Sequence, residues 1–588
     1  MTEEPHGSEL TSRRRVATSP LNTGTPRPPG RDRGRYARYR RDGLWRAERF
    51  DGLLRDWARR DPTTTAVIDT RRSWTYAQLD AAADHVARGL ADLGVQRGDR
   101  VVLQLPNRGE YLEAWFGLQR LGAVPVHAMP GHRRAEISHL VAQSAAAAVI
   151  VADRHGRFDL QAMATAIAEE QPSPRPFVVV VGTPSVAGAV SFSDLTPPAS
   201  SGMGEDGDRH AYSNRSVPDD VALLLLSGGT TGRPKLIPRT HSDYALNVRL
   251  GVRAARLSRD SVYLAALPIG FNFTFACPGV LGTLSVGGTV VLSSDPSPTT
   301  AFPLIAEYQV SHTSLTPALV PAWLDEAVTA SASASSLASL DVVQVGGARL
   351  APEVAARIEP ALGARLQQVY GMAEGLVCYT GLDDPEGLVL ATQGRPACDA
   401  DEIRIVDVDD GEPVPAGKPG ELLTRGPCTI SAYYGAGAER DRAFDPDGFY
   451  RTGDVVRQYP TGHLTVVGRV KDQINRGGEK YAAAEVEEHL AAHPAIGAVA
   501  VVGIEEPDGA EVAVAVVVAN GEVPTIAKLR AHLKDRGLAA YKAPQRVHPV
   551  AELPLTPIGK ADKAALRTLL AETDSLSAPT RGLVYDRR

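Results

Sequence analysis

The 588-residue chain has little cysteine, few aromatic residues and no strong excess of charge of either sign. Its four cysteines are too few for a disulfide scaffold, and none forms the C-x-x-C pair typical of a structural zinc site. A net charge of −6 does not favour binding to nucleic acid or to a membrane through a basic patch. No apolar run reaches the roughly 18 residues of a membrane helix, and the N-terminus lacks the apolar core of a signal peptide. We therefore expect a soluble, cytoplasmic protein without nucleic-acid or membrane partners.

What is present is the composition of a globular chain, with 43% hydrophobic and 22% charged residues. Residues 1–34 are rich in proline and arginine and predict a disordered tail. Residues 35–470 predict a large N-terminal core, in which the dense Gly/Pro turns of about 395–470 indicate a β-rich subdomain. Residues 471–575 predict a small α+β domain, followed by a second tail at 576–588.

The N-terminal core alternates between helical and strand-like patterns. Residues 79–93 have the apolar spacing of a helix that ends at Gly94, and residues 100–107 indicate a buried strand. A helix at 110–122 and a strand at 123–130 follow. Such alternation predicts an α/β fold with parallel sheets in layered subdomains.

The most informative segment follows a four-leucine strand that ends at Leu226. It reads SGGTTGRPK and begins at Ser227. Glycines let the backbone approach an anion, while hydroxyls, N–H groups and a lysine donate to phosphate oxygens. It is not the Walker pattern G-x-x-x-x-G-K-[ST]. A glycine-rich loop alone is commonly an ordinary turn, but the whole string predicts a phosphate loop. Its predicted ligands are Ser227, Gly228, Gly229, Thr230, Thr231, Gly232 and Lys235.

This string resembles the phosphate loop of the adenylate-forming superfamily, which includes acyl- and aryl-CoA synthetases, peptide-synthetase adenylation domains and luciferases. The adjoining LIPRTH and later blocks resemble the aryl-acid branch, the salicylate–AMP and 2,3-dihydroxybenzoate–AMP ligases, from about Tyr36 to Leu570. The resemblance implies activation of an aromatic acid with ATP and Mg²⁺, with release of pyrophosphate. Transfer to the phosphopantetheine thiol of a carrier protein would follow, in siderophore or other natural-product biosynthesis.

Two alternatives stay open beside this reading. An aryl-CoA ligase would share the first step and use free coenzyme A as acceptor. A non-catalytic homologue would have lost Lys560, Glu374 or Asp454, and all three are present.

The resemblance also assigns roles to residues in the nucleotide-binding motifs. Gly347 and Ala348 would pass beside the adenine, and Tyr370, within Tyr370-Gly371-Met372, would stack on it. Glu374 would coordinate magnesium. The remaining nucleotide contacts implied are a ribose carboxylate at Asp454 and a ribose or phosphate contact at Arg469.

The C-terminal part carries the residues that would act in sequence. Lys560, in PLTPIGK, matches the family's catalytic lysine and would bridge the carboxylate and the α-phosphate. Lys471 lies at the position of the family's interdomain hinge, and the resemblance implies that the small domain would be mobile about it. Gly478 and Lys480 would line the thiol channel, although both suit an ordinary surface loop.

The segment GFNFTFACPG, from Gly270 to Gly279, resembles the acid-recognition block of the aryl branch. The substrate residues implied are Phe271, Asn272, Phe273, Cys277, Gly346, Val369, Gly375 and Cys378. Cys277 favours salicylate over dihydroxybenzoate, because a thiol behaves as a small hydrophobe. Two departures, Phe271 for the usual His and Cys378 for the usual Asn, favour an unusual acid such as anthranilate, 3-hydroxyanthranilate or a hydroxypicolinate. The sequence leaves a salicylate-like and an aminobenzoate-like substrate equally open.

Overall fold

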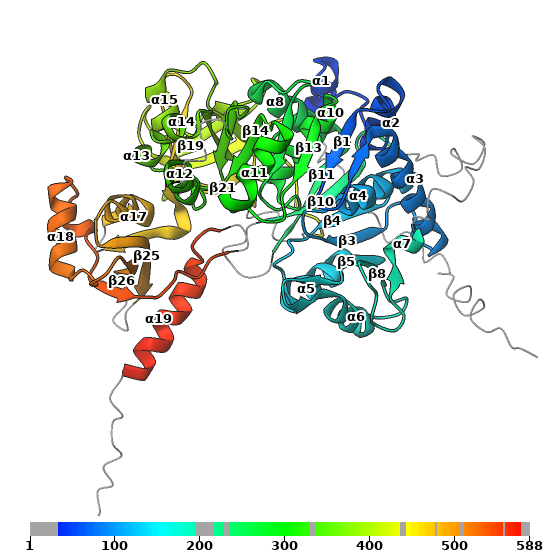
Figure 1. The fold of residues 1–588 in the computed structure, drawn as a ribbon. Coiled ribbons are helices and arrows are strands. Elements are labelled where there is room, and N and C mark those ends of the chain that lie inside the picture. The colour runs from blue at the N-terminus through cyan, green and yellow to red at the C-terminus, as the bar shows by residue number, and fades with distance from the viewer. Residues whose placement is uncertain are drawn as a thin grey trace, which may run out of the picture. The chain divides into compact units, whose positions relative to one another are not determined.

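The computed structural model describes residues 33–195, 216–227, 234–329, 336–435, 443–476, 479–505, 511–556 and 559–577 (Figure 1). These residues fall into two compact units. Unit 1 comprises the chain up to Ile403 together with Leu423–Arg451 and Thr461–His463. Unit 2 comprises Arg404–Leu422, Thr452–Pro460 and the chain from Leu464 onward.

Unit 1 contains a nine-stranded sheet in the order β18-β17-β16-β15-β14-β12-β13-β1-β2. The strands from β16 to β1 pair in parallel, and the edges at β17, β18 and β2 are antiparallel. Their bounds are β1 Thr65–Ile68, β2 Ser73–Thr75, β12 Val262–Ala265, β13 Thr289–Leu292, β14 His312–Leu315, β15 Val342–Gly346, β16 Arg365–Gly371, β17 Val377–Tyr379 and β18 Arg395–Pro396.

A second, seven-stranded sheet of unit 1 has the order β11-β10-β4-β3-β5-β8-β9. Neighbouring strands in this sheet pair in parallel, except that β10 and β11 are antiparallel. Strand β11 is at the edge of the sheet, where Pro238 removes no ladder hydrogen bond. The bounds are β3 Arg100–Gln104, β4 Val124–His127, β5 Ala148–Ala152, β8 Phe177–Val181, β9 Val190–Ser191, β10 Val221–Leu226 and β11 Leu236–Thr240. A separate ribbon pairs β6 Arg154–His155 with β7 Phe158–Asp159.

The helices of unit 1 alternate with these strands, as the sequence pattern predicts. In α3 a Thr75–Gln78 capping box satisfies the first N–H groups. The predicted strand at 100–107 ends earlier, at Gln104, because Pro106 cannot donate to a ladder. The bounds are α1 Arg33–Arg41, α2 Phe50–Arg60, α3 Tyr76–Asp92, α4 Gly109–Leu121, α5 Arg134–Ser144, α6 Leu160–Glu170, α7 Phe192–Leu195, α8 His241–Ala255, α9 Asn272–Ala276, α10 Gly279–Ser285, α11 Pro298–Tyr308, α12 Val320–Thr329, α13 Pro352–Ala355, α14 Ile358–Leu362 and α15 Glu386–Ala391.

Parallel sheets covered on both faces bury their strands completely, and β5 is buried at all five positions. The largest apolar cluster joins strands of the seven-stranded sheet to α3, α4 and α6, and a second cluster packs α11, α12 and α14 on the nine-stranded sheet. The prediction of an α/β fold with a large N-terminal part and a small C-terminal part is confirmed.

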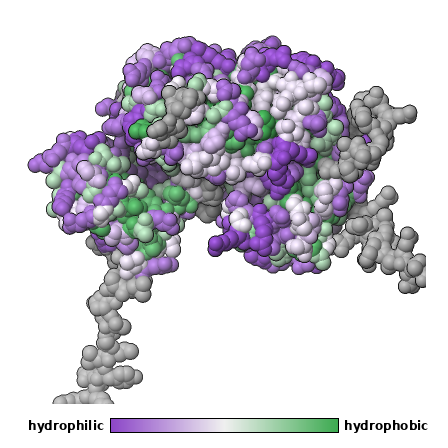
Figure 2. Space-filling model, in the orientation of Figure 1, coloured by the Kyte–Doolittle hydropathy of each residue, from purple (hydrophilic) through white to green (hydrophobic). Residues whose placement is uncertain are grey.

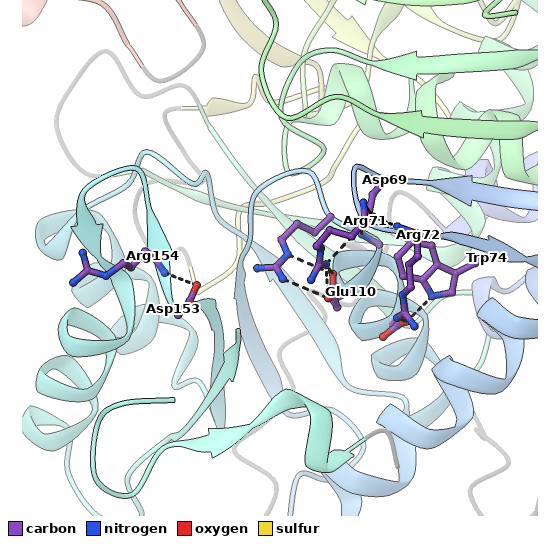
Figure 3. A network of polar contacts seen from close by, with 10 residues as sticks. Asp69, Arg71, Arg72, Trp74, Glu110, Asp153 and Arg154 are labelled. Carbon is purple, nitrogen blue, oxygen red and sulfur yellow. Dashed lines mark hydrogen bonds and ion pairs between the residues drawn. The ribbon is translucent and has the colours of Figure 1, made fainter. Parts of the chain in front are cut away.

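The start of α4 is held by a network of charged groups (Figure 3). Asp69 accepts hydrogen bonds from the backbone N–H groups of Arg71, Arg72 and Gly109, at 2.8, 3.0 and 3.1 Å. Burial alone would raise the pKa of Asp69, but these backbone donors lower it. Arg71 pairs with Glu110 at 2.5 Å, so the first turn of α4 is fixed to the loop after β1.

Unit 2 contains most of the residues of a four-stranded sheet, β19-β20-β21-β22, and the C-terminal elements. It therefore takes in part of the predicted β-rich subdomain. A hairpin β23-β24 and a three-stranded sheet β25-β26-β27 follow. The bounds are β19 Glu402–Val406, β20 Gly420–Arg425, β21 Tyr450–Gln458, β22 Leu464–Arg469, β23 Gln473–Arg476, β24 Glu479–Ala482, β25 Ile496–Glu505, β26 Glu511–Ala519, β27 Arg546–Pro549, α17 Ala483–Ala491, α18 Ile526–Asp535 and α19 Lys563–Ser577, with 3₁₀ turns η3 Val470–Asp472 and η4 Ala540–Lys542.

On the face drawn in Figure 2, hydrophilic side chains interrupt the apolar ones. Five large apolar residues of the described chain are exposed, namely Phe158, Val217, Val328, Val523 and Leu555. Within the described ranges, no helix is both long and apolar enough to cross a membrane.

Candidate active site

The acid-recognition segment lies between β12 and α10 in unit 1. Phe271 caps α9 in an extended conformation, and the chain reverses at Gly279 with φ +47°. A Cβ atom at Gly279 would lie 1.7 Å from the carbonyl oxygen of Thr274, so only glycine permits this turn. The segment is thus held in a compact shape by its own backbone.

Three predicted substrate residues, Phe273, Cys277 and Val369, are buried together in one apolar cluster, against which Phe271 packs. Gly346, at the end of β15, lies beneath them, because a Cβ there would be 2.7 Å from the Val369 oxygen and 3.1 Å from the Phe273 ring. We call this the acyl cluster, and its buried members are Leu267, Phe273, Cys277, Val369, Val377 and Tyr379.

A chain of polar side chains runs along the edge of the acyl cluster. The Tyr244 hydroxyl donates to Asn272 Oδ1 at 2.7 Å, and Asn272 Nδ2 donates to Cys277 Sγ at 3.7 Å. Asn247 Nδ2 also donates to this sulfur at 3.7 Å. Burial raises the pKa of the Cys277 thiol to about 11, so it is neutral at physiological pH. Cys277 therefore presents a weakly polar group, and Asn272 is held in one orientation.

The structure does not bring Cys378 into the acyl cluster. Tyr370 and Cys378 are cross-strand partners in β16 and β17, and the side chains of neighbouring strand residues point to opposite faces. Val377 and Tyr379, on either side of Cys378, belong to the cluster instead. Gly375 lies against the backbone of Cys428 and Thr429, where a Cβ would meet atoms at 2.4 Å.

The nucleotide-binding motifs meet around Tyr433, a residue that the motifs did not reveal. Its hydroxyl donates to Glu374 Oε1 at 2.8 Å and lies 2.9 Å from the Tyr450 hydroxyl. The Lys235 ammonium lies over its ring, 4.9 Å from the centroid. Tyr433 thus joins the end of the phosphate loop to the buried carboxylate of Glu374.

The loop around Glu374 is itself fixed by backbone bonds. The N–H of Met372 donates to the Leu376 oxygen at 3.1 Å, and the N–H of Ile430 donates to the Glu374 oxygen at 2.8 Å. Tyr370 and Gly371 end β16 just before this loop, and Tyr370 is half-buried. Gly347 follows β15 with φ +91°, and Ala348 after it is exposed.

The base of the phosphate loop is closed by a pair of bonds between its first and last residues. Ser227 N–H donates to the Lys235 oxygen at 3.0 Å, and Lys235 N–H donates to Ser227 Oγ at 3.0 Å. The predicted ligands Gly228, Gly229, Thr230, Thr231 and Gly232 lie outside the described residues. The antiparallel β10–β11 pair therefore positions the two ends of the loop.

Unit 2 carries the predicted ribose-binding pair and the predicted catalytic lysine. Asp454 and Arg469 are direct partners in β21 and β22, and Arg469 Nε lies 2.8 Å from Asp454 Oδ1. Desolvation, followed by the positive charge of Arg469, lowers the pKa of Lys560 to about 8, while Asp454 opposes the shift. The charges of Asp454 and Arg469 therefore both act on the ammonium of Lys560.

The turn that carries Lys560 is tightly bonded. Thr556 N–H donates to the Lys560 oxygen at 2.7 Å, Gly559 N–H donates to the Thr556 oxygen at 2.8 Å, and Gly559 has φ +76°. Glycine at this last position is typical of a hairpin with a bulge. Of the other unit 2 predictions, Lys471 lies exposed in η3, Lys480 lies in β24 with its backbone paired to Asn475, and Gly478 is outside the described residues.

The carboxylate of Glu374 is the group that suits a hard cation such as Mg²⁺, which binds proteins through one or two carboxylates and otherwise through waters and phosphates. Within the described residues no cluster of three His, Cys, Asp or Glu side chains forms a complete metal cage. The donor set therefore fits a metal that reaches the site together with a phosphorylated substrate.

Comparison with known proteins gives consistent matches over most of the chain. Residues 54–434 match the family model described as AMP-binding enzyme, and residues 485–560 match that of the AMP-binding enzyme C-terminal domain. The first range contains Asn272 and Glu374 and the second contains Lys560, whereas Asp454 and Arg469 fall between them.

The matches to individual proteins are close. The chain is 46% identical over 545 residues to a salicylyl-CoA synthase / salicylate adenylyltransferase of Streptomyces sp., covering 92% of this chain and 97% of the relative. It is 45% identical over 538 residues to the 2,3-dihydroxybenzoate-AMP ligase of Bacillus subtilis, covering 91% and 96%. The apo structure of Mycobacterium smegmatis MbtA has a TM-score of 0.69 at 44% identity, over 96% of this chain and 100% of that one.

Proposed function

Because the chain belongs to the AMP-binding enzyme family, we propose that it uses ATP to activate an ortho-substituted aromatic carboxylic acid as its aryl adenylate. The family membership expected from the sequence motifs is confirmed. The observation that carries the substrate class is the acyl cluster, whose side chains are mostly apolar and whose edge is formed by Asn272 and Cys277. An aromatic ring suits the apolar residues, and a polar substituent beside its carboxylate suits the amide.

In the first step the acid's carboxylate oxygen attacks the α-phosphorus of ATP, and the bond to the pyrophosphate oxygen breaks. Negative charge must be held on the phosphate oxygens while this happens, so catalysis depends on positioning and cationic stabilisation. Lys560 would neutralise charge between the carboxylate and the α-phosphate, and Lys235 would do so at the phosphate loop. Magnesium held by Glu374 would supply further charge neutralisation.

Asp454 would accept hydrogen bonds from the two ribose hydroxyls, because a carboxylate suits a vicinal diol. Arg469, already bonded to Asp454, would keep that carboxylate oriented. Tyr370 would lie against the adenine. Burial, followed by the charge of Glu374, raises the pKa of Tyr450, which supports a neutral Tyr450 beside Glu374.

In the second step a thiol would attack the aryl adenylate, form the thioester and release AMP. We propose the phosphopantetheine thiol of a carrier protein as the acceptor, in siderophore or related natural-product biosynthesis. Support comes from a relative in Mycobacterium tuberculosis, 46% identical, that is named a salicyl-AMP ligase / salicyl-S-ArCP synthetase. Free coenzyme A is the second candidate, because the Streptomyces relative is named a salicylyl-CoA synthase.

Asn272 can pair with an ortho substituent of either kind. Its Oδ1 accepts one hydrogen bond from Tyr244 and its Nδ2 donates one to Cys277 Sγ, which leaves one acceptor position and one N–H among the described residues. A salicylate-like acid is favoured instead by two relatives that are named for salicylate.

Acid-dependent ATP–pyrophosphate exchange tests the proposal. The panel is benzoate, salicylate, 2,3-dihydroxybenzoate, anthranilate, 3-hydroxyanthranilate and 3-hydroxypicolinate. Strongest exchange with salicylate supports a salicylate-like substrate, strongest exchange with an amino or pyridine acid contradicts it, and no exchange with any acid contradicts the proposed function. Incubation with ATP, the preferred acid and either coenzyme A or a phosphopantetheinylated aryl carrier protein then identifies the acceptor.

The role of Lys560 can be tested in the same assay. Lys560→Ala should lower exchange by roughly 100-fold or more, the scale of losing one charge-stabilising group, while thioester formation from supplied aryl adenylate continues. Lys563→Ala is the matched control. Lys563 lies three residues after Lys560 in the chain, and its ammonium forms an ion pair with Glu487. Equal loss of both half-reactions in Lys560→Ala would contradict the assignment.

A further inference from the structure

Arg239 is a fully buried cation that none of the sequence motifs assigns to a task. It lies in β11, just before α8, with no exposed surface (Figure 1). A buried charge is costly unless it is paired, and Arg239 Nε lies 2.7 Å from Asp243 Oδ1. Burial alone would lower the pKa of Arg239, but Asp243 outweighs it and raises the pKa, so the guanidinium stays charged.

Besides its ion pair with Asp243, this guanidinium contacts two further residues, Ala373 and Tyr244. Arg239 Nη1 donates to the carbonyl oxygen of Ala373 at 2.9 Å, immediately before Glu374 in the chain. Its face lies over the ring of Tyr244, 4.9 Å from the centroid. Nη2 has no hydrogen-bond partner among the described residues.

Each of these two contacts leads to a residue of the candidate active site. Through Ala373, Arg239 holds the loop that carries Glu374, whose carboxylate is also bonded to Tyr433. Through Tyr244, it supports the ring whose hydroxyl fixes Asn272 at 2.7 Å. One buried side chain is thus in contact with both the metal-side loop and the polar edge of the acyl cluster.

We propose that Arg239 is a positioning residue that fixes the Glu374 loop and the Tyr244–Asn272 pair relative to one another. A guanidinium suits this task because it is planar. Its fork reaches Asp243 and Ala373 at once while its face stacks on Tyr244, which a lysine ammonium cannot do. The inference rests on the proposed function and adds a residue through which ATP-side and acid-side binding are linked.

Arg239→Lys is the first test, because it keeps the charge opposite Asp243 but loses the fork and the flat face. It should raise the KM for ATP and the KM for the acid together and lower kcat/KM by roughly 10- to 100-fold, the scale of a small misplacement of reacting groups. Arg120→Lys is the matched control. Arg120 is a buried arginine of α4 whose partners are Asp80 and Asp84, and it contacts neither Glu374 nor Asn272. It should lose thermal stability without change in either KM.

Tyr244→Phe tests the contact toward Asn272 separately from the contact toward the Glu374 loop. It also keeps the inference testable if Arg239→Lys folds poorly. It retains the ring under the guanidinium and removes only the hydroxyl bonded to Asn272. It should raise the KM for the acid and leave the KM for ATP unchanged. In the double variant, Arg239→Lys should then add a further increase in the KM for ATP but little in the KM for the acid.

Several results would overturn the inference. One is that Arg239→Lys has the wild-type KM for ATP and the wild-type KM for the acid. Both are measured at a temperature where tryptophan fluorescence shows the variant to be folded. Another is that the double variant raises the KM for the acid by the product of the increases seen in Arg239→Lys and Tyr244→Phe alone. Tyr244→Phe with an unchanged KM for the acid would also contradict it. Absence of exchange in the wild-type enzyme would contradict the proposed function instead, so the two failures are distinguishable.

Discussion

Asn107 provides a sharp test of how the acid-recognition segment is held. Its amide bridges two parts of unit 1 that are far apart in the chain. Nδ2 donates to the carbonyl oxygens of Ala265 and Leu267, both at 3.0 Å, and Oδ1 accepts from the N–H of Ile269 at 2.8 Å. These three bonds hold the loop that leads from β12 into α9, and Asn107 itself is held next to the fixed start of α4.

Each such bond contributes about 0.5–1.5 kcal/mol, so Asn107→Ala should lower the free energy of unfolding of unit 1 by about 3 kcal/mol. Asn107→Asp has the same shape, yet it should be at least as damaging at pH 7, because a carboxylate would face two carbonyl oxygens. The mutant carboxyl would have a raised pKa in the folded state. Its favourable, protonated contribution would be present at low pH and lost as the pH rises through that pKa.

The assay is urea unfolding followed by tryptophan fluorescence. The chain has five tryptophans, and all of them lie in unit 1, so the signal reports the unit that contains Asn107. The KM for the acid, measured by exchange, gives a second reading that should rise in both variants. If Asn107→Asp proved more stable than Asn107→Ala at pH 7, or if both had the wild-type acid KM, the amide would not be holding the loop by its donors.

Three further outcomes are expected. The protonated ammonium of Lys560 is the form that neutralises phosphate, so kcat/KM for exchange should fall as the pH rises through about 8, and a profile flat to pH 9.5 would contradict this. Cys277→Ser should raise the exchange ratio of 2,3-dihydroxybenzoate to salicylate roughly tenfold, because a hydroxyl can pair with the extra hydroxyl; an unchanged ratio would remove Cys277 from acid selection. Tyr433→Phe removes the donor to Glu374, so the Mg²⁺ concentration for half-maximal exchange should rise roughly tenfold, and an unchanged Mg²⁺ titration would show that this hydroxyl does not orient Glu374.

The fold could be predicted from the sequence because its signals are local. The alternation of helix and strand patterns in residues 79–130 is confirmed by α3, β3, α4 and β4. Strand ends were less predictable, as at Gln104, because a pairing partner decides where a ladder stops. The division of residues 402–469 between the two units was not visible either, since it depends on contacts between residues distant in the chain.

The candidate site was predicted only as far as its motifs extend. Tyr433 and Tyr244 are single residues without a motif, and their importance comes from one hydroxyl bond each to Glu374 and Asn272. Cys378, predicted to lie in the acid site with Cys277, is outside the acyl cluster because side chains alternate along β17, and Val377 and Tyr379 belong to the cluster instead. The alternation of side chains along β17 was the available signal. Using it would have required knowing which residues of β16 and β17 pair, because that register decides which side chains face the acid site.

The site residues therefore divide into two kinds by how far their contacts reach. Members of the acyl cluster, such as Val369 and Cys277, pack within that one cluster. Side chains that bridge segments, such as Arg239 and Asn107, also form hydrogen bonds with residues far away in the chain, as in Arg239 to Ala373 and Asn107 to Ala265. Substitution in the first kind should change which acid is accepted while leaving the KM for ATP unchanged. Substitution in the second kind should weaken every acid alike, because the frame that presents Asn272 shifts as a whole. An exchange panel run on one variant of each kind would separate specificity from positioning within the same unit.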